Sequence, residues 1–108
     1  MITITLFENK KSQLTGFTVC GHAGYGEHGT DIVCAAVTTA AMTAVNGLTD
    51  VVGLAPELTV EEGNLSCCLP AVLSDEKRHD ADVLLSSMVL TMENLAEQYG
   101  DYVSLKKK

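Results

Sequence analysis

The segment over residues 32–49 most constrains the fold, because it contains no charged residue. A helix without a charged face is buried against other elements, and its small side chains let those elements approach closely. Asp31 stands directly before the segment, where its carboxylate can accept a backbone N–H as a helix N-cap. Gly53 and Pro56 follow as stop signals. We predict a largely buried helix over about residues 32–52, which another layer of structure must cover. Its small residues are Ala35, Ala36, Ala40, Ala41 and Ala44.

Strand patterns flank this helix on both sides and can supply that layer. Isoleucine and leucine alternate with threonine at the start of the chain, which is typical of a half-buried strand. A polar turn and a second β-prone segment follow, so the first two strands form a hairpin. Gly63-Asn64 predicts the turn of a second hairpin. The expected strands cover residues 2–7, 14–21, 57–62, 65–69 and a final edge strand at 102–105.

A second helix is predicted between the second hairpin and the last strand. Ser74 can cap it, and Asp75 and Glu76 are favourable in its first turn. Gly100 is a natural C-terminal stop. The resulting order is ββαββαβ, so we expect residues 1–108 to form a single α+β domain with a mostly antiparallel sheet packed with two helices. The apolar stripe of this helix is Ala81, Leu84, Leu85, Met88, Met92, Leu95, Ala96 and Tyr99.

Charge and hydropathy limit the partners that the chain can have. The net charge is −7, and the lysines of residues 106–108 are the only basic cluster, so we expect no direct nucleic-acid binding. Threonines and Asn46 interrupt the most apolar run, and we expect no membrane-spanning segment. The N-terminus lacks the basic start and long apolar run of an export signal. We therefore expect a cytoplasmic protein.

The sequence has four cysteines, and they fall into two groups. Without an export signal, disulfides are not expected. Cys67 and Cys68 are adjacent in a predicted strand, where they would point to opposite faces of the sheet. We interpret these two and Cys20 as buried apolar side chains, which is how most unpaired cysteines behave. Cys34 differs, because it falls in the first turn of the predicted helix.

Cys34 and His22 are candidates for catalysis. Cysteine attacks as its thiolate, and the free N–H groups at a helix start stabilise that anion and can also bind an oxyanion. A glycine-rich loop over residues 23–30 joins the two residues, so the imidazole can take the thiol proton. Asp31 either orients His22 or only caps the helix. From the pattern alone, His22 could instead be a structural histidine and Cys34 a core residue, because a cysteine and a histidine often occur together in a short chain.

Two other kinds of site compete for the same residues. The segment from Gly24 to Gly29 fits the dinucleotide fingerprint G-x-G-x-x-G. A hairpin precedes it, however, and no acidic residue ends a following parallel strand, so the fingerprint lacks its context. A zinc site would use cysteine and histidine ligands, but their spacing matches no compact zinc motif. We expect no cofactor and no bound metal. The zinc candidates are Cys20, His22, His28 and Cys34.

At these residues the sequence resembles the ribosomal-processing cysteine proteases, the Prp family. The likeness covers nearly the whole chain, including its length and element order. Its specific part is a pair of motifs at a fixed spacing. The shared residues are Gly21-His22-Ala23-Gly24-Tyr25, then Gly29, then Asp31-Ile32-Val33-Cys34-Ala35.

The resemblance implies a cytosolic endopeptidase that removes a short N-terminal extension from large-subunit ribosomal protein twenty-seven and so permits ribosome assembly. It also implies a homodimer. Carried over by position, His22 would be the base and Cys34 the nucleophile, with Asp31 as the acidic residue beside it. Many members have serine four residues after the cysteine, where this chain has Thr38. The loop residues Gly21, Ala23, Gly24, Gly29 and Ala35 would contact substrate. The alternative hypothesis is a non-catalytic ribosome-associated binding module on the same fold.

Overall fold

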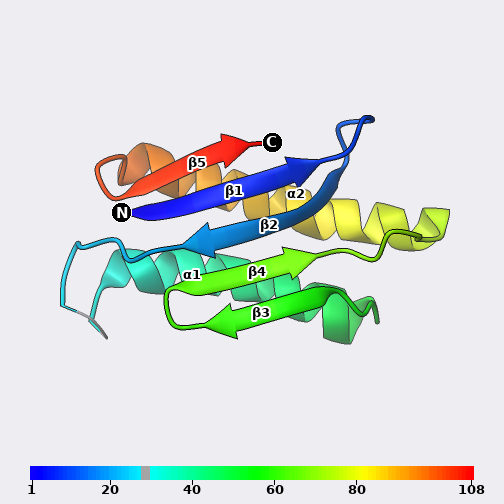
Figure 1. Cartoon of the computed structure of the whole chain (residues 1–108), viewed down its shortest axis with the longest axis horizontal. Helices are drawn as coiled ribbons and strands as arrows, with labels where there is room; N and C mark the ends of the chain where they lie inside the picture. The colour runs from blue at the N-terminus through cyan, green and yellow to red at the C-terminus, as the bar shows by residue number, and fades with distance from the viewer. Residues whose placement is uncertain (28–29) are drawn as a thin grey trace.

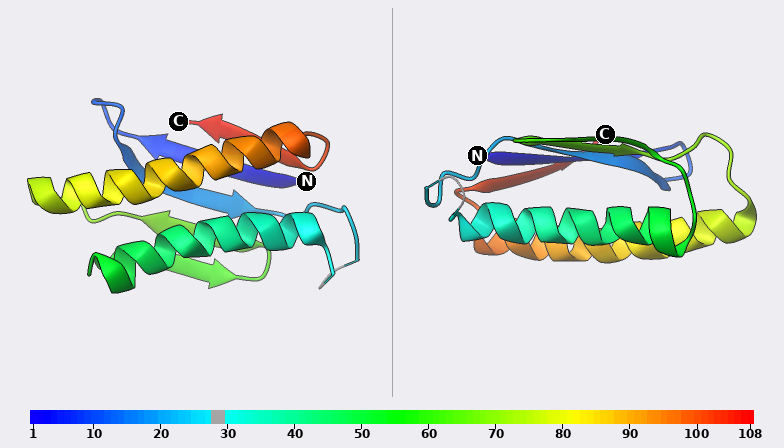
Figure 2. Two further views of the ribbon diagram at one scale, coloured as in Figure 1. Left: turned by 180° about the vertical axis from the view of Figure 1, so that it is seen from behind. Right: turned by 90° about the horizontal axis from the view of Figure 1, so that it is seen from below.

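The computed structural model describes residues 1–27 and 30–108, which form two layers (Figure 1). One layer is a five-stranded sheet in the order β3-β4-β2-β1-β5, and both helices lie on the same face of it (Figure 2). This is the single α+β fold that the sequence predicts. The elements are β1 (Ile2–Glu8), β2 (Leu14–Cys20), α1 (Ile32–Asn46), η1 (Gly47–Val51), β3 (Glu57–Glu61), β4 (Asn64–Cys68), α2 (Asp75–Gln98) and β5 (Val103–Lys107).

Strand pairing in the sheet is mostly antiparallel, as expected. β1 pairs with β2, β2 with β4, and β3 with β4, all antiparallel. Only β5 runs parallel to its neighbour β1, because α2 carries the chain back across the sheet before β5 begins. β5 is an edge strand, as predicted, and β3 forms the opposite edge. The β2–β4 pairing brings the second hairpin beside the end of β2.

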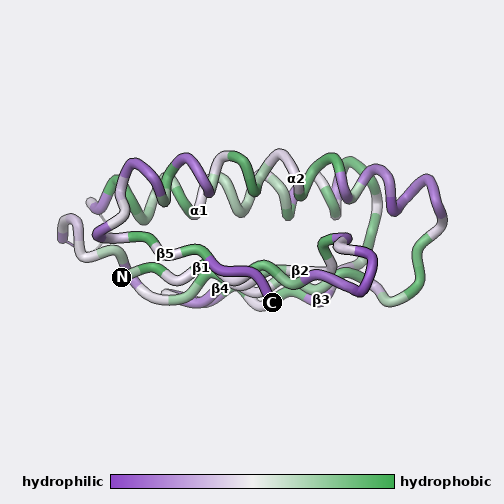
Figure 3. Tube along the Cα trace, turned by 90° about the horizontal axis from the view of Figure 1, so that it is seen from above, coloured by the Kyte–Doolittle hydropathy of each residue, from purple (hydrophilic) through white to green (hydrophobic). Residues whose placement is uncertain are grey.

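The hydrophobic core lies between the sheet and the helices, which are seen edge-on in Figure 3. Alternate residues of β1 and β2 point toward the helices, and one face of each helix meets them. The α1 face is built from small and β-branched side chains, which lets the helix lie close to the sheet. The largest fully buried side chains are Phe17, Ile4, Leu6, Leu48, Leu85, Met92, Val33, Val37 and Cys67.

The first helical segment is about as long as the sequence predicts, and it is more apolar than its threonines and Asn46 suggested. α1 continues through the π-helical turn η1, and residues 32–51 together are long and apolar enough to cross a membrane by length and composition. Our expectation that no segment would meet that criterion was wrong. The finding is weak evidence for a membrane span, because the core helix of a soluble protein passes the same test. Here the buried face of α1 packs in the core.

Two details of the second hairpin differ from the predictions. The turn is formed by Glu62 and Gly63, with Gly63 at φ +71°, rather than by Gly63-Asn64. The prediction that three cysteines are buried apolar side chains is confirmed for Cys67 alone. Cys67 is buried and Cys68 is exposed, so these two neighbours point to opposite faces of the sheet, as expected. Cys20 is exposed as well, because it ends β2 on the face that the helices do not cover. Burial raises the pKa of the Cys67 thiol to about 11, helped by the neighbouring Cys68. Cys67 is therefore an unreactive thiol at neutral pH.

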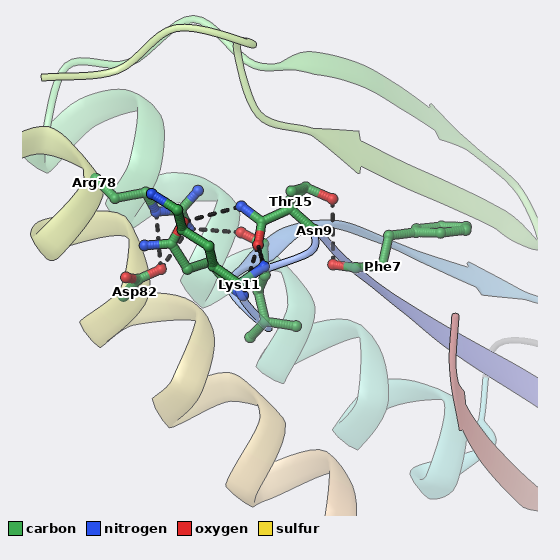
Figure 4. A network of polar contacts seen from close by, with 8 residues as sticks. Phe7, Asn9, Lys11, Thr15, Arg78 and Asp82 are labelled. Atoms are coloured by element: carbon green, nitrogen blue, oxygen red, sulfur yellow. Dashed lines mark hydrogen bonds and ion pairs between the residues drawn. The ribbon is translucent and has the colours of Figure 1, made fainter.

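A polar network closes the end of the sheet that lies opposite the loop before α1 (Figure 4). The Asn9 side chain accepts hydrogen bonds from the backbone N–H groups of Lys11 and Gln13 and so holds the β1–β2 turn. The Arg78 guanidinium forms an ion pair with Asp82 one turn along α2. It also donates to the Leu14 carbonyl oxygen over 2.6 Å. These contacts fix the start of α2 to the start of β2.

The core position of η1 leads to a stability prediction. Leu48 is fully buried, and we expect Leu48→Ala to lower the free energy of unfolding by about 2–5 kcal/mol through lost burial and a residual cavity. Val51 lies three residues along the same turn and is 82% exposed, so Val51→Ala should change stability by less than about 0.5 kcal/mol. Urea unfolding followed by circular dichroism measures both values. An equal decrease in the free energy of unfolding of the two variants would contradict this placement of η1.

Candidate active site

Cys34 lies in the first turn of α1, as the sequence predicts. Asp31 is the N-cap, also as predicted, and its Oδ1 accepts hydrogen bonds from the N–H groups of Val33 and Cys34 at 2.9 and 3.1 Å. The Cys34 side chain is half-buried against the core. The thiol therefore combines a fixed backbone with partial access to solvent. A nucleophilic cysteine needs both of these features.

The second oxygen of Asp31 holds the loop that precedes the helix. Its Oδ2 accepts hydrogen bonds from the N–H groups of Tyr25 and Gly26 at 2.9 and 3.0 Å. Burial raises the pKa of the Asp31 carboxyl, but the four backbone N–H donors outweigh that effect and bring the pKa below its ordinary value. Asp31 is therefore an anion that joins the helix start to the loop. Helix capping was one of the two roles that we considered for Asp31. It accounts for the contacts of Oδ1 but not for those of Oδ2.

The Tyr25 side chain anchors the same loop to the far side of the domain. Its ring packs edge-on against Tyr99, with ring centroids 5.7 Å apart, and against Tyr102, with centroids 5.1 Å apart. Tyr99 ends α2, and Tyr102 lies just before β5. Edge-to-face contacts of this kind stabilise by about 0.5–1.5 kcal/mol each. Backbone hydrogen bonds and aromatic packing thus hold the loop together.

His22 lies just after β2, and the loop brings its segment against the Cys34 sulfur. Gly21 adopts φ +93°, which only glycine adopts without strain, and so redirects the chain at the end of the strand. The N–H of Ala23 then donates a hydrogen bond to the Cys34 Sγ over 3.2 Å. The His22 side chain is exposed and lines the same cleft as Cys34. The structure therefore gathers the two predicted catalytic residues in one place.

The cleft has a volume of about 750 Å³ and lies between the loop, α1 and the second hairpin. Most of the other residues proposed from the sequence are found there. Gly21, Gly24, Asp31, Ala35 and Thr38 line it, and Thr38 is exposed one helical turn after the cysteine. Ala23 contributes through its N–H, while its methyl group is buried. Gly29 and His28 lie outside the described residues.

One wall of this cleft is not apparent from the sequence. The β3–β4 hairpin lines it, and the hairpin turn lies at the same end of the sheet as the loop (Figure 1). The local pattern of these residues indicates only strands and a turn. The pairing of β4 with β2 places them at the site, and no local sequence pattern reveals that pairing. The hairpin residues are Val60, Glu61, Glu62, Gly63, Asn64 and Leu65.

The helix-start amides are not available in the way that we expected. The N–H groups of Val33 and Cys34 both donate to Asp31, so neither is free to bind an oxyanion in this structure. The next amide, that of Ala35, donates to the Asp31 carbonyl oxygen at 3.1 Å. The donor aimed at the sulfur is instead the N–H of Ala23. The Val33 and Cys34 amides thus serve the helix cap in this structure, and a role of helix-start amides in binding an oxyanion stays a prediction.

Neither of the two alternative kinds of site gains support from the geometry. β1 and β2 form an antiparallel hairpin before the glycine-rich loop, whereas a dinucleotide fingerprint opens a parallel βαβ unit. The zinc candidates include His28, which lies outside the described residues. Within residues 1–27 and 30–108, no three histidine, cysteine, aspartate or glutamate side chains gather as a metal site.

Comparison with known proteins identifies the family. A family model described as Cysteine protease Prp matches residues 1–104. The chain belongs to the cysteine protease Prp family. It is 33% identical over 103 residues to the ribosomal processing cysteine protease Prp of Bacillus subtilis (strain 168), and the match covers 94% of this chain and 92% of the relative. The Staphylococcus aureus (strain Mu50) protein of the same name is 26% identical over 108 residues and matches along the full length of both chains.

A solved structure supports the same assignment. The crystal structure of the ribosomal processing protease Prp from S. aureus, in complex with a covalently linked product peptide, matches with a TM-score of 0.89. The two chains are 25% identical, and the match covers 100% of each. This Prp-family chain is thus an enzyme, a cysteine peptidase, and the binding-module hypothesis is set aside. The resemblance noted from the paired motifs is confirmed.

The two-sided role of Asp31 leads to a prediction about pH. Asn at position 31 keeps one oxygen to cap α1 but turns an NH₂ group toward the loop amides, so we expect Asp31→Asn to destabilise the protein. Because the native pKa of Asp31 is lowered, its contribution is present above its ordinary value of 3.8 and is lost as the pH falls through the native pKa.

The measurement is the free energy of urea unfolding for wild type and Asp31→Asn at a series of values from about pH 7 to about pH 3. The free energy of unfolding of wild type should exceed that of the variant most at neutral pH. This difference should become smaller as the pH is lowered. A gap that stays constant over the whole series would contradict the proposed role of the ionised carboxylate.

Proposed function

We propose that this chain removes the N-terminal extension of large-subunit ribosomal protein twenty-seven by Cys–His acyl transfer and so supports ribosome assembly. The observation that carries the proposal is the 3.2 Å hydrogen bond from the Ala23 N–H to the Cys34 sulfur, which holds the His22 segment against the nucleophile. The names of its relatives, ribosomal processing cysteine proteases, support the substrate class. A cytoplasmic location is part of the same proposal.

The proposed reaction begins when the His22 imidazole takes the proton of the Cys34 thiol. The thiolate attacks the scissile carbonyl carbon and forms an S–C bond, which moves the carbonyl π electrons onto oxygen. The C–N bond then breaks as the imidazolium returns the proton to the departing amine. Water, deprotonated by His22, hydrolyses the thioester and releases the free thiol. The covalently linked product peptide in the S. aureus relative supports a covalent route.

The oxyanion of this reaction develops beside the sulfur, so its donors must lie there too. The Ala23 N–H is the backbone donor aimed at Sγ, and we assign it to the oxyanion once the carbonyl carbon has bonded to sulfur. The Val33 and Cys34 amides act indirectly, because they hold Asp31 and thereby keep the helix start and the loop together. Thr38 lines the cleft one turn from Cys34 and has a supporting role.

The cleft suits an extended peptide with apolar side chains and basic neighbours. Its floor is apolar, with Val19, Val37 and Met42 among its lining residues. Glu61 and Glu62 stand on its hairpin side, both exposed. Together with the net charge of −7, they favour the approach of a basic protein by long-range attraction. Ribosomal proteins, which neutralise RNA phosphates, are typically basic.

The nucleophile assignment is tested by substitution of each accessible cysteine. Cys34→Ala and Cys34→Ser should lower the cleavage rate of the extended ribosomal protein by more than about 10⁴-fold, since the acyl-enzyme can no longer form. Cys20→Ala and Cys68→Ala are matched controls, because both thiols are exposed and neither lines the cleft. Mass spectrometry of the substrate before and after incubation measures product. Cleavage by Cys34→Ala at the wild-type rate would refute the mechanism.

We also propose that the enzyme is a homodimer formed through the outer face of its helical layer. A groove of about 600 Å³ runs between α1 and α2 on this face. Its lining is almost entirely apolar or small, and Ile32 beside it is 57% exposed. The Prp-family resemblance implies the second copy as the occupant of this groove. The other residues that line it are Ala35, Ala36, Thr39, Ala40, Thr43, Ala44, Leu84, Ser87, Met88 and Thr91.

A charge placed in the groove tests the dimer. Thr39 is exposed and lines the groove, so Thr39→Arg should place a charge and a long side chain in the interface and shift the protein to monomer. Asn46 is exposed on the same helix outside the groove, and Asn46→Arg should leave the assembly unchanged. Sedimentation velocity over a concentration series measures the mass. A wild-type chain that is monomeric at all concentrations would exclude the dimer.

A further inference from the structure

The turn of the β3–β4 hairpin lies directly beside the segment that carries His22. β2 and β4 are paired up to Cys20 and Asn64. The ladder continues one step beyond the strands, because the Gly21 N–H donates to the Gly63 carbonyl oxygen over 2.9 Å. A main-chain hydrogen bond thus fixes the residue before His22 to the hairpin turn. The turn is part of the site by backbone contact.

The tip of the His22 imidazole lies beside the place that a β-carbon of Gly63 would occupy. A β-carbon built on Gly63 would lie 3.0 Å from Nε2, 3.5 Å from Cε1 and 3.7 Å from Cδ2 of His22. All three atoms belong to the imidazole ring itself. The shortest of these distances is tighter than ordinary van der Waals contact, so a side chain at position 63 would displace the ring or the turn. The bare backbone of Gly63 therefore fits against the imidazole.

Gly63 has both a positive φ and a close neighbour in His22. A comparison with Gly53 separates the effects of these two features. Both residues have positive φ, +71° at Gly63 and +82° at Gly53, so alanine is strained at either position. Around Gly53, however, a β-carbon would meet only the Lys77 Nζ, at the ordinary distance of 3.8 Å. Of these two glycines, only Gly63 combines the left-handed conformation with close contact to His22. Gly53 therefore reports the effect of conformational strain without a contact to the imidazole.

We propose that the turn of the β3–β4 hairpin, through the bare backbone of Gly63, is a wall that positions the His22 imidazole for proton transfer with Cys34. Gly63 is a positioning residue, since it touches the base and not the reacting atoms. This inference rests on the role of His22 in the proposed function. His22 is exposed, so the protein interior does not enclose its ring. A wall on one side reduces the orientations that the ring can adopt.

The first test compares Gly63→Ala with Gly53→Ala as the matched control. Both substitutions impose a similar left-handed strain, so both should lower thermal stability in the same direction. Only Gly63→Ala should lower kcat, with KM little changed, and the loss should reach at most about 10²-fold, which is the effect of misplacing a catalytic group by about 1 Å. Gly53→Ala should keep the wild-type kcat. Wild-type kcat in Gly63→Ala, or an equal loss in both variants, would overturn the proposal.

The second test reads the position of the ring directly and needs no variant. In the NMR spectrum of the wild-type chain, nuclear Overhauser cross-peaks should connect the ring protons of His22 with the α protons of Gly63. This measurement decides the question if Gly63→Ala does not fold, and the absence of the cross-peaks at a pH where the enzyme cleaves would overturn the proposal. In folded Gly63→Ala, the ring signals of His22 should shift while those of His79 stay in place.

The two readouts also separate this inference from the proposed function. If wild type produces no cleavage, the protease substrate or mechanism is wrong, while the cross-peaks still report on the wall. If wild type cleaves and Gly63→Ala cleaves equally fast, the wall has no positioning role and the protease function stands. Both the protease function and the positioning role of Gly63 are supported if Gly63→Ala cleaves more slowly, its His22 signals are displaced and Gly53→Ala cleaves at the wild-type rate.

Discussion

The two oxygens of one buried carboxylate connect the start of the helix that carries Cys34 to the loop that follows His22. Oδ1 of Asp31 accepts the first amides of α1, and Oδ2 accepts two amides of the loop. A single N-cap would satisfy the helix alone. Because the helix start and the loop donate to the same carboxylate, Asp31 joins the turn that carries Cys34 to the loop after His22. A neutral side chain of the same shape lacks the second acceptor.

The strand order of the sheet determines where the β3–β4 hairpin lies relative to the cleft. Had β3 and β4 paired beyond β5, the cleft would have lost the wall that the hairpin forms. The antiparallel pairing of β2 with β4 instead brings the hairpin turn to the point where β2 ends and Gly21 redirects the chain. The site is therefore built from a loop, a helix start and a hairpin turn, each fixed to a rigid element at one end of the sheet. Precise placement on so small a domain follows from these rigid supports.

Much of the fold could be predicted from local patterns, because each element buries one face. The uncharged residues before Asp50 indicate a core helix, and alternation with threonine indicates β1. The errors have local physical causes. A two-residue turn can shift by one position when glycine is flanked by polar residues on both sides, as Gly63 is. Residue type alone predicts buried side chains for Cys20 and Cys68, but strand alternation places them on the face that the helices leave open.

Only part of the candidate site could be predicted from the sequence. The other part depends on contacts between segments that are distant in the sequence. His22 and Cys34 stand out because their motifs carry reactive side chains at a set spacing. The hairpin wall depends on strand pairing, and our proposal for the oxyanion donor depends on which amides already donate to another acceptor. A helix start offers free N–H groups only where its cap leaves them free, and the Asp31 carboxylate does not. Asp31 therefore occupies two of the helix-start amides, whereas the N–H of Ala23 in the loop faces the sulfur, and for this reason we propose the loop amide as the oxyanion donor.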